Sequence, residues 1–113
     1  PTSTLFPYTT LFRSRSTLKT LLRDARTLLD EYDRDYLILD PMATQDTETR
    51  LMSLIDRVLT ESHIKLPETY TLHYTDGLGV VRDIKIGKKD THLYAKESYM
   101  FLSHKINNMN EEN

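Results

Sequence analysis

Residues 69–87 read TYTLHYTDGLGVVRDIKIG and decide the fold class of this chain. Every second residue from Tyr70 to Tyr74 is apolar, and this period of two among threonines and aromatic side chains predicts a strand. The sequence DGLG at 76–79 supplies residues that tolerate positive φ, as a tight reversal requires. The chain then returns as a second predicted strand over 80–86. The stretch therefore predicts an antiparallel β-hairpin.

A first amphipathic helix is predicted well before the hairpin. From Ser16 onward apolar residues recur every three or four positions, with charged residues on the opposite face. The apolar stripe consists of Leu18, Leu21, Leu22, Ala25, Leu28, Leu29 and Tyr32. Ser14 or Ser16 is the candidate N-cap. We expect the helix to end between Tyr32 and Leu39, because Pro41 biases Asp40 away from helical geometry.

A second helix is predicted between the first helix and the hairpin. It follows the polar stretch 43–49, with Thr44 or Asp46 as its cap and acidic residues in its first turn. Its apolar face consists of Leu51, Leu54, Ile55, Val58 and Leu59. Leu66 and Pro67 close this segment before the first strand begins.

A third helix is predicted after the hairpin, with Asp90 or Thr91 as its cap. Its stripe consists of Ala95, Tyr99, Leu102, Ile106 and Met109, and residues 107–113 are expected to fray. The resulting order, helix-helix-hairpin-helix, predicts a small single α+β domain with helices packed on one face of the antiparallel hairpin. A two-stranded hairpin is marginal alone, so it must pack on the helices or gain strands from a second copy. A homodimer is therefore one expected assembly.

The N-terminal residues differ in pattern from the rest of the chain. Residues 4–14, TLFPYTTLFRS, match codon for codon the translation of a common sequencing adapter, and this is the one resemblance found in the chain. It implies that residues 1–14 are a non-native, disordered segment and that natural sequence resumes near Arg15 or Ser16. We then expect residues 15–113 to form the domain, with any element that natively preceded them replaced by the adapter.

Composition limits the class of protein. A chain of 113 residues with a formal net charge of −2 fits one small domain without a general attraction to nucleic acid or anionic membrane. The absence of cysteine excludes disulfides, thiolate catalysis and cysteine-based zinc sites. No apolar run approaches the roughly 18 residues of a membrane span. We expect a cytoplasmic protein without a cofactor.

One local reversal of charge predicts a ligand surface. Residues 82–92 read RDIKIGKKDTH and carry the cations Arg82, Lys85, Lys88, Lys89 and His92. Cations beside the first N–H groups of a helix favour phosphate or carboxylate, and Tyr70 and Tyr74 could stack on a base. This predicts a site for a small anionic ligand such as a nucleotide. The alternative is a solvated loop with the two tyrosines in the core, and no second glycine precedes Gly87 as a phosphate loop requires.

Other constellations give weaker signals. The acidic run Asp30, Glu31, Asp33 and Asp35 resembles the start of a calcium loop, but the glycine and the closing glutamate are absent, so we expect a solvated face and no metal. The four histidines lack the helical spacing of a zinc pair. If the chain is an enzyme, His92 with Asp90 or Asp83 is the first candidate acid/base pair.

These features favour a non-enzymatic binding protein, which docks on a protein partner or holds a small anionic ligand. A microbial or viral inhibitor or sponge of a host factor would fit this description. The second interpretation is a winged-helix-like DNA-binding regulator whose wing is the basic hairpin. Nucleic acid is the less favoured partner, because acidic side chains outnumber Arg50 and Arg57 on the second helix. A small enzyme is the third interpretation.

Overall fold

The computed structural model describes the backbone of residues 2–109 and the side chains of residues 15–109. Within this part of the chain the elements are α1 (Thr2–Leu37), α2 (Pro41–Ser62), β1 (Thr69–Thr75), β2 (Val81–Gly87) and α3 (Thr91–Asn107). The two strands pair antiparallel. The predicted α+β class and the order helix-helix-hairpin-helix are confirmed. Residues 110–113 of the predicted frayed tail lie outside the described residues.

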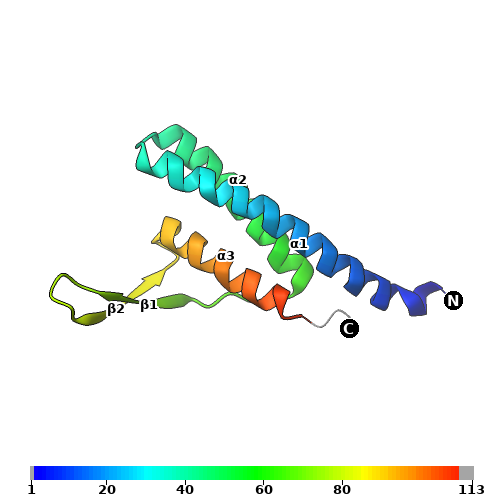
Figure 1. The fold of residues 1–113 in the computed structure, drawn as a ribbon. Helices are drawn as coiled ribbons and strands as arrows, with labels where there is room; N and C mark the ends of the chain where they lie inside the picture. The colour runs from blue at the N-terminus through cyan, green and yellow to red at the C-terminus, as the bar shows by residue number, and fades with distance from the viewer. Residues whose placement is uncertain (1, 110–113) are drawn as a thin grey trace.

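The helices form the body of the molecule. Helices α1 and α2 run antiparallel, α3 packs against both, and the hairpin continues away from the end of the helices where α1 turns into α2 (Figure 1). The core is built from residues of the predicted stripes: Leu18, Leu21, Leu22, Ala25, Leu28, Leu29, Tyr32, Leu51, Ile55, Val58, Ala95, Leu102 and Ile106. The other predicted stripe residues are partly buried and pack against this core: Leu54, Leu59, Tyr99 and Met109. Each buried leucine or isoleucine side chain contributes on the order of 1.5–3 kcal/mol.

Helix α1 begins earlier than the sequence analysis expected. Its backbone is helical from Thr2, whereas the predicted start was Ser14 or Ser16. Adding residues to an existing helix needs no new nucleus, so helical backbone extends readily beyond the packed stripe. The side chains of residues 1–14 lie outside the described part of the chain. That this segment is non-native and adds nothing to folding stays a prediction.

Helix α2 also begins earlier, and here the predicted cap was wrong. The helix starts at Pro41, and the Asp40 carboxylate accepts a hydrogen bond from the backbone N–H of Ala43 at 3.1 Å. Proline suits the first helical position because its fixed φ is already helical and it has no N–H to satisfy. The same proline that ends α1 therefore begins α2. Thr44 and Asp46 lie inside the helix rather than at its cap.

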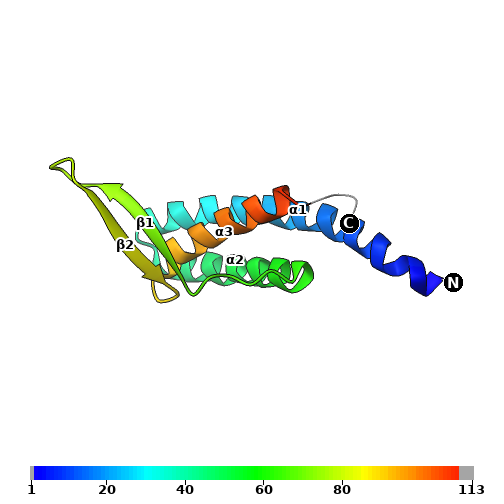
Figure 2. The same ribbon diagram turned by 90° about the horizontal axis from the view of Figure 1, so that it is seen from below.

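The hairpin is covered only at its base. Ile86 is 2% exposed and lies against α3, whereas Ile84, on the same face, is 46% exposed. In the loop, Gly79 has a φ of +81° and its N–H donates to the Asp76 carbonyl at 3.0 Å, so the predicted positive-φ residue is Gly79. Seen from below, the strands extend past the helices as a two-stranded projection (Figure 2).

An acid titration tests the geometry of the hairpin loop. The Arg82 guanidinium, followed by the backbone N–H groups of Val80 and Leu78, holds the pKa of Asp76 below its ordinary value. A lowered folded-state pKa gives stabilisation that is present above the unfolded pKa of about 3.9 and is lost as pH falls through the folded value. We expect the Leu78 and Val80 amide resonances to shift in NMR spectra below about pH 4. Asp76→Asn should abolish this transition; its persistence would assign the titration to another carboxyl group.

Candidate functional site

Tyr70, one of the predicted stacking residues, is an anchor for the hairpin. Its hydroxyl and the hydroxyl of the fully buried Ser98 lie 2.9 Å apart, and its ring contacts Tyr94 with centroids separated by 5.1 Å. Burial is the main cause that raises the pKa of Tyr70 above its ordinary value. The ring of Tyr70 therefore packs against α3 from the base of the hairpin. These contacts agree with the alternative interpretation, in which Tyr70 packs on the helices rather than stacking on a base.

Three other predicted site residues lie along the projecting strands. Tyr74 is paired with Arg82 across the hairpin and is about half exposed. The Nε atom of Arg82 donates to Asp76 at 2.6 Å, so this cation is engaged within the loop. Lys85 is exposed and lies on the face of the hairpin opposite to Tyr74 and Arg82, because successive side chains of a strand alternate. These residues do not converge with Tyr70 on one cavity.

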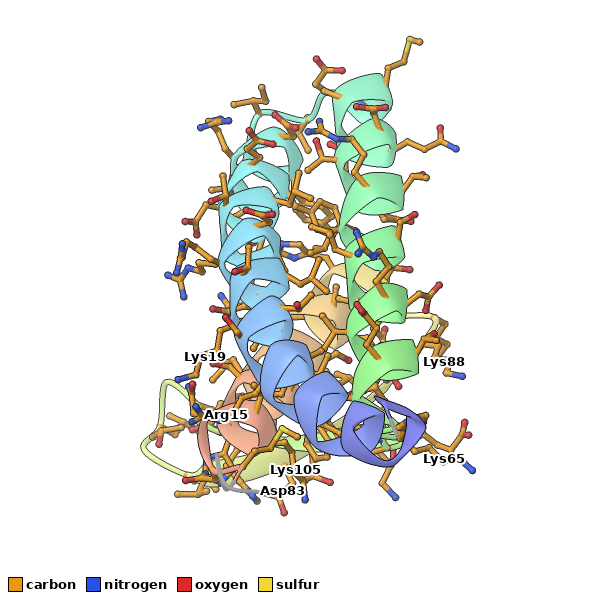
Figure 3. The ribbon with its side chains drawn as sticks, turned by 90° about the vertical axis from the view of Figure 1, so that its right-hand side faces the viewer. Arg15, Lys19, Lys65, Asp83, Lys88 and Lys105 are labelled. Atoms are coloured by element: carbon orange, nitrogen blue, oxygen red, sulfur yellow. The ribbon has the colours of Figure 1, made fainter. Side chains whose placement is uncertain are left out.

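Lys88 borders a cavity of about 450 Å³ between α2, α3 and the segment that leads to β1. This cavity is lined by Met52, Ile55, Asp56, Leu59, Ile64, Lys65, Leu66, Glu68, Lys88, Thr91 and Tyr94. Lys65 and Lys88 project on the same side of the molecule, and Asp83 of the hairpin lies elsewhere (Figure 3). The rim also carries Asp56 and Glu68, so its formal charges are balanced.

Lys89 and His92 border a different cavity of about 420 Å³, at the junction of the three helices. There His92 pairs through Nε2 with Asp33 of α1, and its ring stacks on Tyr36 with centroids 4.5 Å apart. Among the described residues, neither of the predicted partner carboxylates, Asp90 and Asp83, forms a hydrogen bond or an ion pair with His92. Asp83 pairs with His73 at 2.5 Å, and Asp90 accepts from the Gly87 N–H at 3.1 Å.

Tyr32 forms the inner wall of this junction. Its hydroxyl donates to Glu48 of α2 at 2.7 Å. Burial, reinforced by the adjacent Glu48 carboxylate, raises the pKa of Tyr32 well above its ordinary value. The tyrosine therefore stays protonated and donating at neutral pH. Together with His92 and Asp33, it ties the three helices to one another by polar contacts.

The acidic run that ends α1 is divided among separate partners. Asp30 pairs with Arg26 at 3.3 Å, Asp33 with His92, and Asp35 accepts from the Thr47 hydroxyl at 2.9 Å. Among the residues that the structure describes, no group of three or more histidine, aspartate or glutamate side chains is arranged to hold a metal ion. The run acts as a set of helix contacts and surface charges.

The largest departure from the expected site is an apolar surface at the turn between α1 and α2, which we call the tip surface. It consists of Leu37, Ile38, Leu39 and Met42, which are 79%, 64%, 82% and 83% exposed. Beside it lies a hollow of about 420 Å³, lined by Tyr36, Leu39, Asp40, Pro41, Thr44, Gln45 and Glu48. The sequence signal was present: a run of three apolar residues before Asp-Pro cannot all face the core of one helix.

Comparisons with protein-family models, with curated proteins and with solved structures found no match to this chain. The candidate site is therefore defined by its own geometry. It comprises the tip surface and the adjacent hollow, at the end of the molecule from which the hairpin also projects (Figure 1). The residues of the tip surface were not predicted as a site, because they carry no charge and form no chemical motif.

The surface of α2 bears on the DNA-binding interpretation. Its arginines pair with acids one turn away: Arg50 with Asp46 at 3.7 Å and Arg57 with Glu61 at 3.9 Å. Such pairing reduces the charge that these arginines can offer to phosphates. Among the described helices, none combines the length and the apolarity that crossing a bilayer requires.

Proposed function

We propose that the chain is a non-enzymatic interaction protein that binds a protein partner through the tip surface. The observation that carries this proposal is the exposure of Leu37, Ile38, Leu39 and Met42, between 64% and 83%, on one short turn. Single exposed apolar residues are common, but a contiguous apolar patch on a small protein marks an interaction site. A partner that covers these four side chains would remove their apolar area from water.

The backbone of the turn supports the same proposal. Leu39 has a φ of 57°, in the left-handed region that glycine or asparagine adopts more readily. A left-handed conformation costs a non-glycine residue roughly 1–2 kcal/mol. The chain thus places a strained backbone and an exposed apolar side chain at the same residue. Folding alone gains little from this leucine, and a binding contact would account for it.

The surroundings of the tip surface indicate the chemistry of the partner. Asp40 and Glu48 border the adjacent hollow, and each carboxylate uses one oxygen within the protein, for Ala43 and Tyr32 respectively. The second oxygen of each can accept from a partner. We therefore expect an apolar side chain to enter the hollow, with a lysine or arginine next to it in the partner.

The charged segment 82–92 gives less support to a single anion site. Arg82 pairs with Asp76 in the loop, Lys85 lies on one face of the hairpin, and Lys88 and Lys89 border different cavities. A small anion would contact one or two of these cations at a time. The protein-partner form of the binding hypothesis is therefore the better supported one.

A displayed library of random peptides tests the tip surface without knowledge of the natural partner. Peptides selected on the intact protein should combine an apolar anchor with a neighbouring lysine or arginine. Met42→Asp should weaken their binding at least about tenfold, which corresponds to about 1.4 kcal/mol. This change keeps the fold, because an acidic residue in the first turn of α2 complements the helix dipole.

Two further variants complete this test. Met100→Asp introduces the same charge at a half-exposed position on α3 and should leave peptide binding unchanged. Leu39→Gly relieves the left-handed backbone, so it should weaken binding while the melting temperature stays equal or rises. Selected peptides that bind all these variants with equal affinity would show that the tip surface is not the docking site.

A further inference from the structure

The projecting half of the hairpin carries apolar side chains, interrupted by Arg82, on a sheet face that the helices leave uncovered. Tyr74, Val80 and Ile84 are 48%, 48% and 46% exposed, although the face that they share is buried at Ile86. A two-stranded sheet is marginal without further packing or further strands. Within the described chain, the outer half of the hairpin packs on no helix and pairs with no third strand. This surface is separate from the tip surface, and the inference drawn from it does not depend on the proposed function.

The outer edge of β2 is open for pairing. Hydrogen-bonded pairs alternate along an antiparallel ladder, and the Asp76 N–H donates to the Val80 carbonyl at 2.9 Å where the ladder meets the loop. By this alternation the backbone groups of Asp83 and Lys85 point away from β1. Within the described residues, no backbone hydrogen bond joins either residue to an element outside the hairpin. An extended strand could therefore add at this edge.

The charge pattern of β2 favours β2 of a second copy of this chain as the added strand. In a symmetric antiparallel pair centred on Ile84, Asp83 of each copy lies opposite Lys85 of the other, which places two opposite-charge pairs beside the axis. Centring the pair on Asp83, on Lys85 or on Arg82 instead places a charged residue opposite its own copy. Like charges directly opposite are destabilising, so the register centred on Ile84 is favoured.

We infer that two copies of this chain associate through their β2 edges, antiparallel and centred on Ile84, into a four-stranded sheet. The two Ile84 side chains meet on the apolar face at the two-fold axis and cover part of each other. On the opposite face Asp83 already contacts His73 through Oδ1, which leaves Oδ2 for Lys85 of the second copy. The interface is isologous, as the symmetry of a dimer requires.

The edge of β1 has no charge pattern that would select a register for pairing with a second copy. Residues 69–75 contain no lysine, arginine, aspartate or glutamate, so no register of β1 with its own copy is selected by formal charge. Registers of an edge without such selection slip easily. The β2 edge is thus the one to which charge assigns a single self-pairing.

Charge exchange tests the inferred register by sedimentation or native mass spectrometry. The unaltered protein should dimerise at concentrations on the order of 100 µM or below. Lys85→Asp and Asp83→Lys each turn both opposite-charge pairs into like-charge pairs and should weaken dimerisation roughly 10- to 100-fold. An equimolar mixture of these two variants should form heterodimers, because each then faces its opposite charge. The double variant, Asp83→Lys with Lys85→Asp, should dimerise as the unaltered protein does.

A single introduced cysteine gives an independent readout, since the described chain contains no other cysteine. Directly opposite residues of a non-hydrogen-bonded pair have Cα atoms about 4.5 Å apart, within the reach of a disulfide. Ile84→Cys should therefore oxidise readily to a linked dimer, whereas Val81→Cys, an exposed position on the same strand, should not. A monomeric unaltered protein, or a dimer indifferent to both charge variants and to the choice of cysteine position, would overturn the inference. Circular dichroism of each variant separates loss of pairing from loss of fold.

Discussion

Replacing Leu51 by alanine is expected to lower the free energy of unfolding by about 2–5 kcal/mol. Leu51 is 0% exposed and lies on the face of α2 that packs into the core with Leu18 and Ile55. The loss combines the transfer free energy of the removed atoms with the cavity that they leave. A domain of this size has a total stability of roughly 5–15 kcal/mol, so the variant should melt much earlier. Urea unfolding followed by far-ultraviolet circular dichroism measures the change.

Leu37→Ala is the matched control for Leu51→Ala. It removes the same atoms from a helix of the same pair, but Leu37 is largely exposed at the tip surface. Its change in the free energy of unfolding should stay within about 0.5 kcal/mol. Equal losses for the two variants would contradict the packing of α2 against α1. The control also bears on function, because Leu37→Ala should weaken peptide binding at the tip surface while the fold is kept.

The second large effect is expected for Tyr70→Ala, with a loss on the order of 3 kcal/mol. The change removes the ring that packs on Tyr94 and Phe101, and it leaves the buried Ser98 hydroxyl without the Tyr70 hydroxyl. The hairpin should then lose its attachment to α3. Hydrogen exchange of the β1 and β2 amides, measured beside global urea unfolding, reports both consequences.

Tyr74→Ala supplies the comparison for Tyr70→Ala. Tyr74 lies four residues further along the chain, on the same face of β1, and is about half exposed. Its replacement should cost less than about 1 kcal/mol, and Tyr70→Phe should fall between the two because it removes only the hydroxyl. If Tyr70→Ala and Tyr74→Ala were equally mild, the base of the hairpin would not be anchored as described.

The element types and their order could be predicted because they depend on the local spacing of apolar residues. The stripes on α1 and α2 needed only a spacing of three and four, and the hairpin needed only alternation around a turn with Gly79. Ser98 was not predicted as a buried residue of α3, because serine is polar. Its hydroxyl can be buried because the Tyr70 hydroxyl lies within hydrogen-bond distance of it. The start of α2 was misplaced because Pro41 serves both to end one helix and to begin the next.

The surroundings of the predicted ligand surface at 82–92 were less predictable, since they depend on contacts between distant residues. His92 meets Asp33, which lies 59 residues away in the sequence, and no spacing rule connects the two. The cations of 82–92 are close in sequence, but a strand alternates its side chains and the following turn sends Lys88 and Lys89 to different cavities. Their closeness in sequence had predicted one surface. That they jointly bind an anion stays a prediction.

Sequence alone determined which residues are apolar at helical or strand period, and hence the element types, their order and the α+β class. It also carried the charge pattern of β2, in which Asp83 and Lys85 flank Ile84 symmetrically. The tertiary structure decided which parts of each apolar face are covered: α3 covers Ile86, whereas Ile84 stays 46% exposed and the tip-surface residues stay 64–83% exposed. The reason is physical. Periodicity is a property of one element, whereas burial depends on where a second element ends, and each end is set by packing between segments far apart in the sequence.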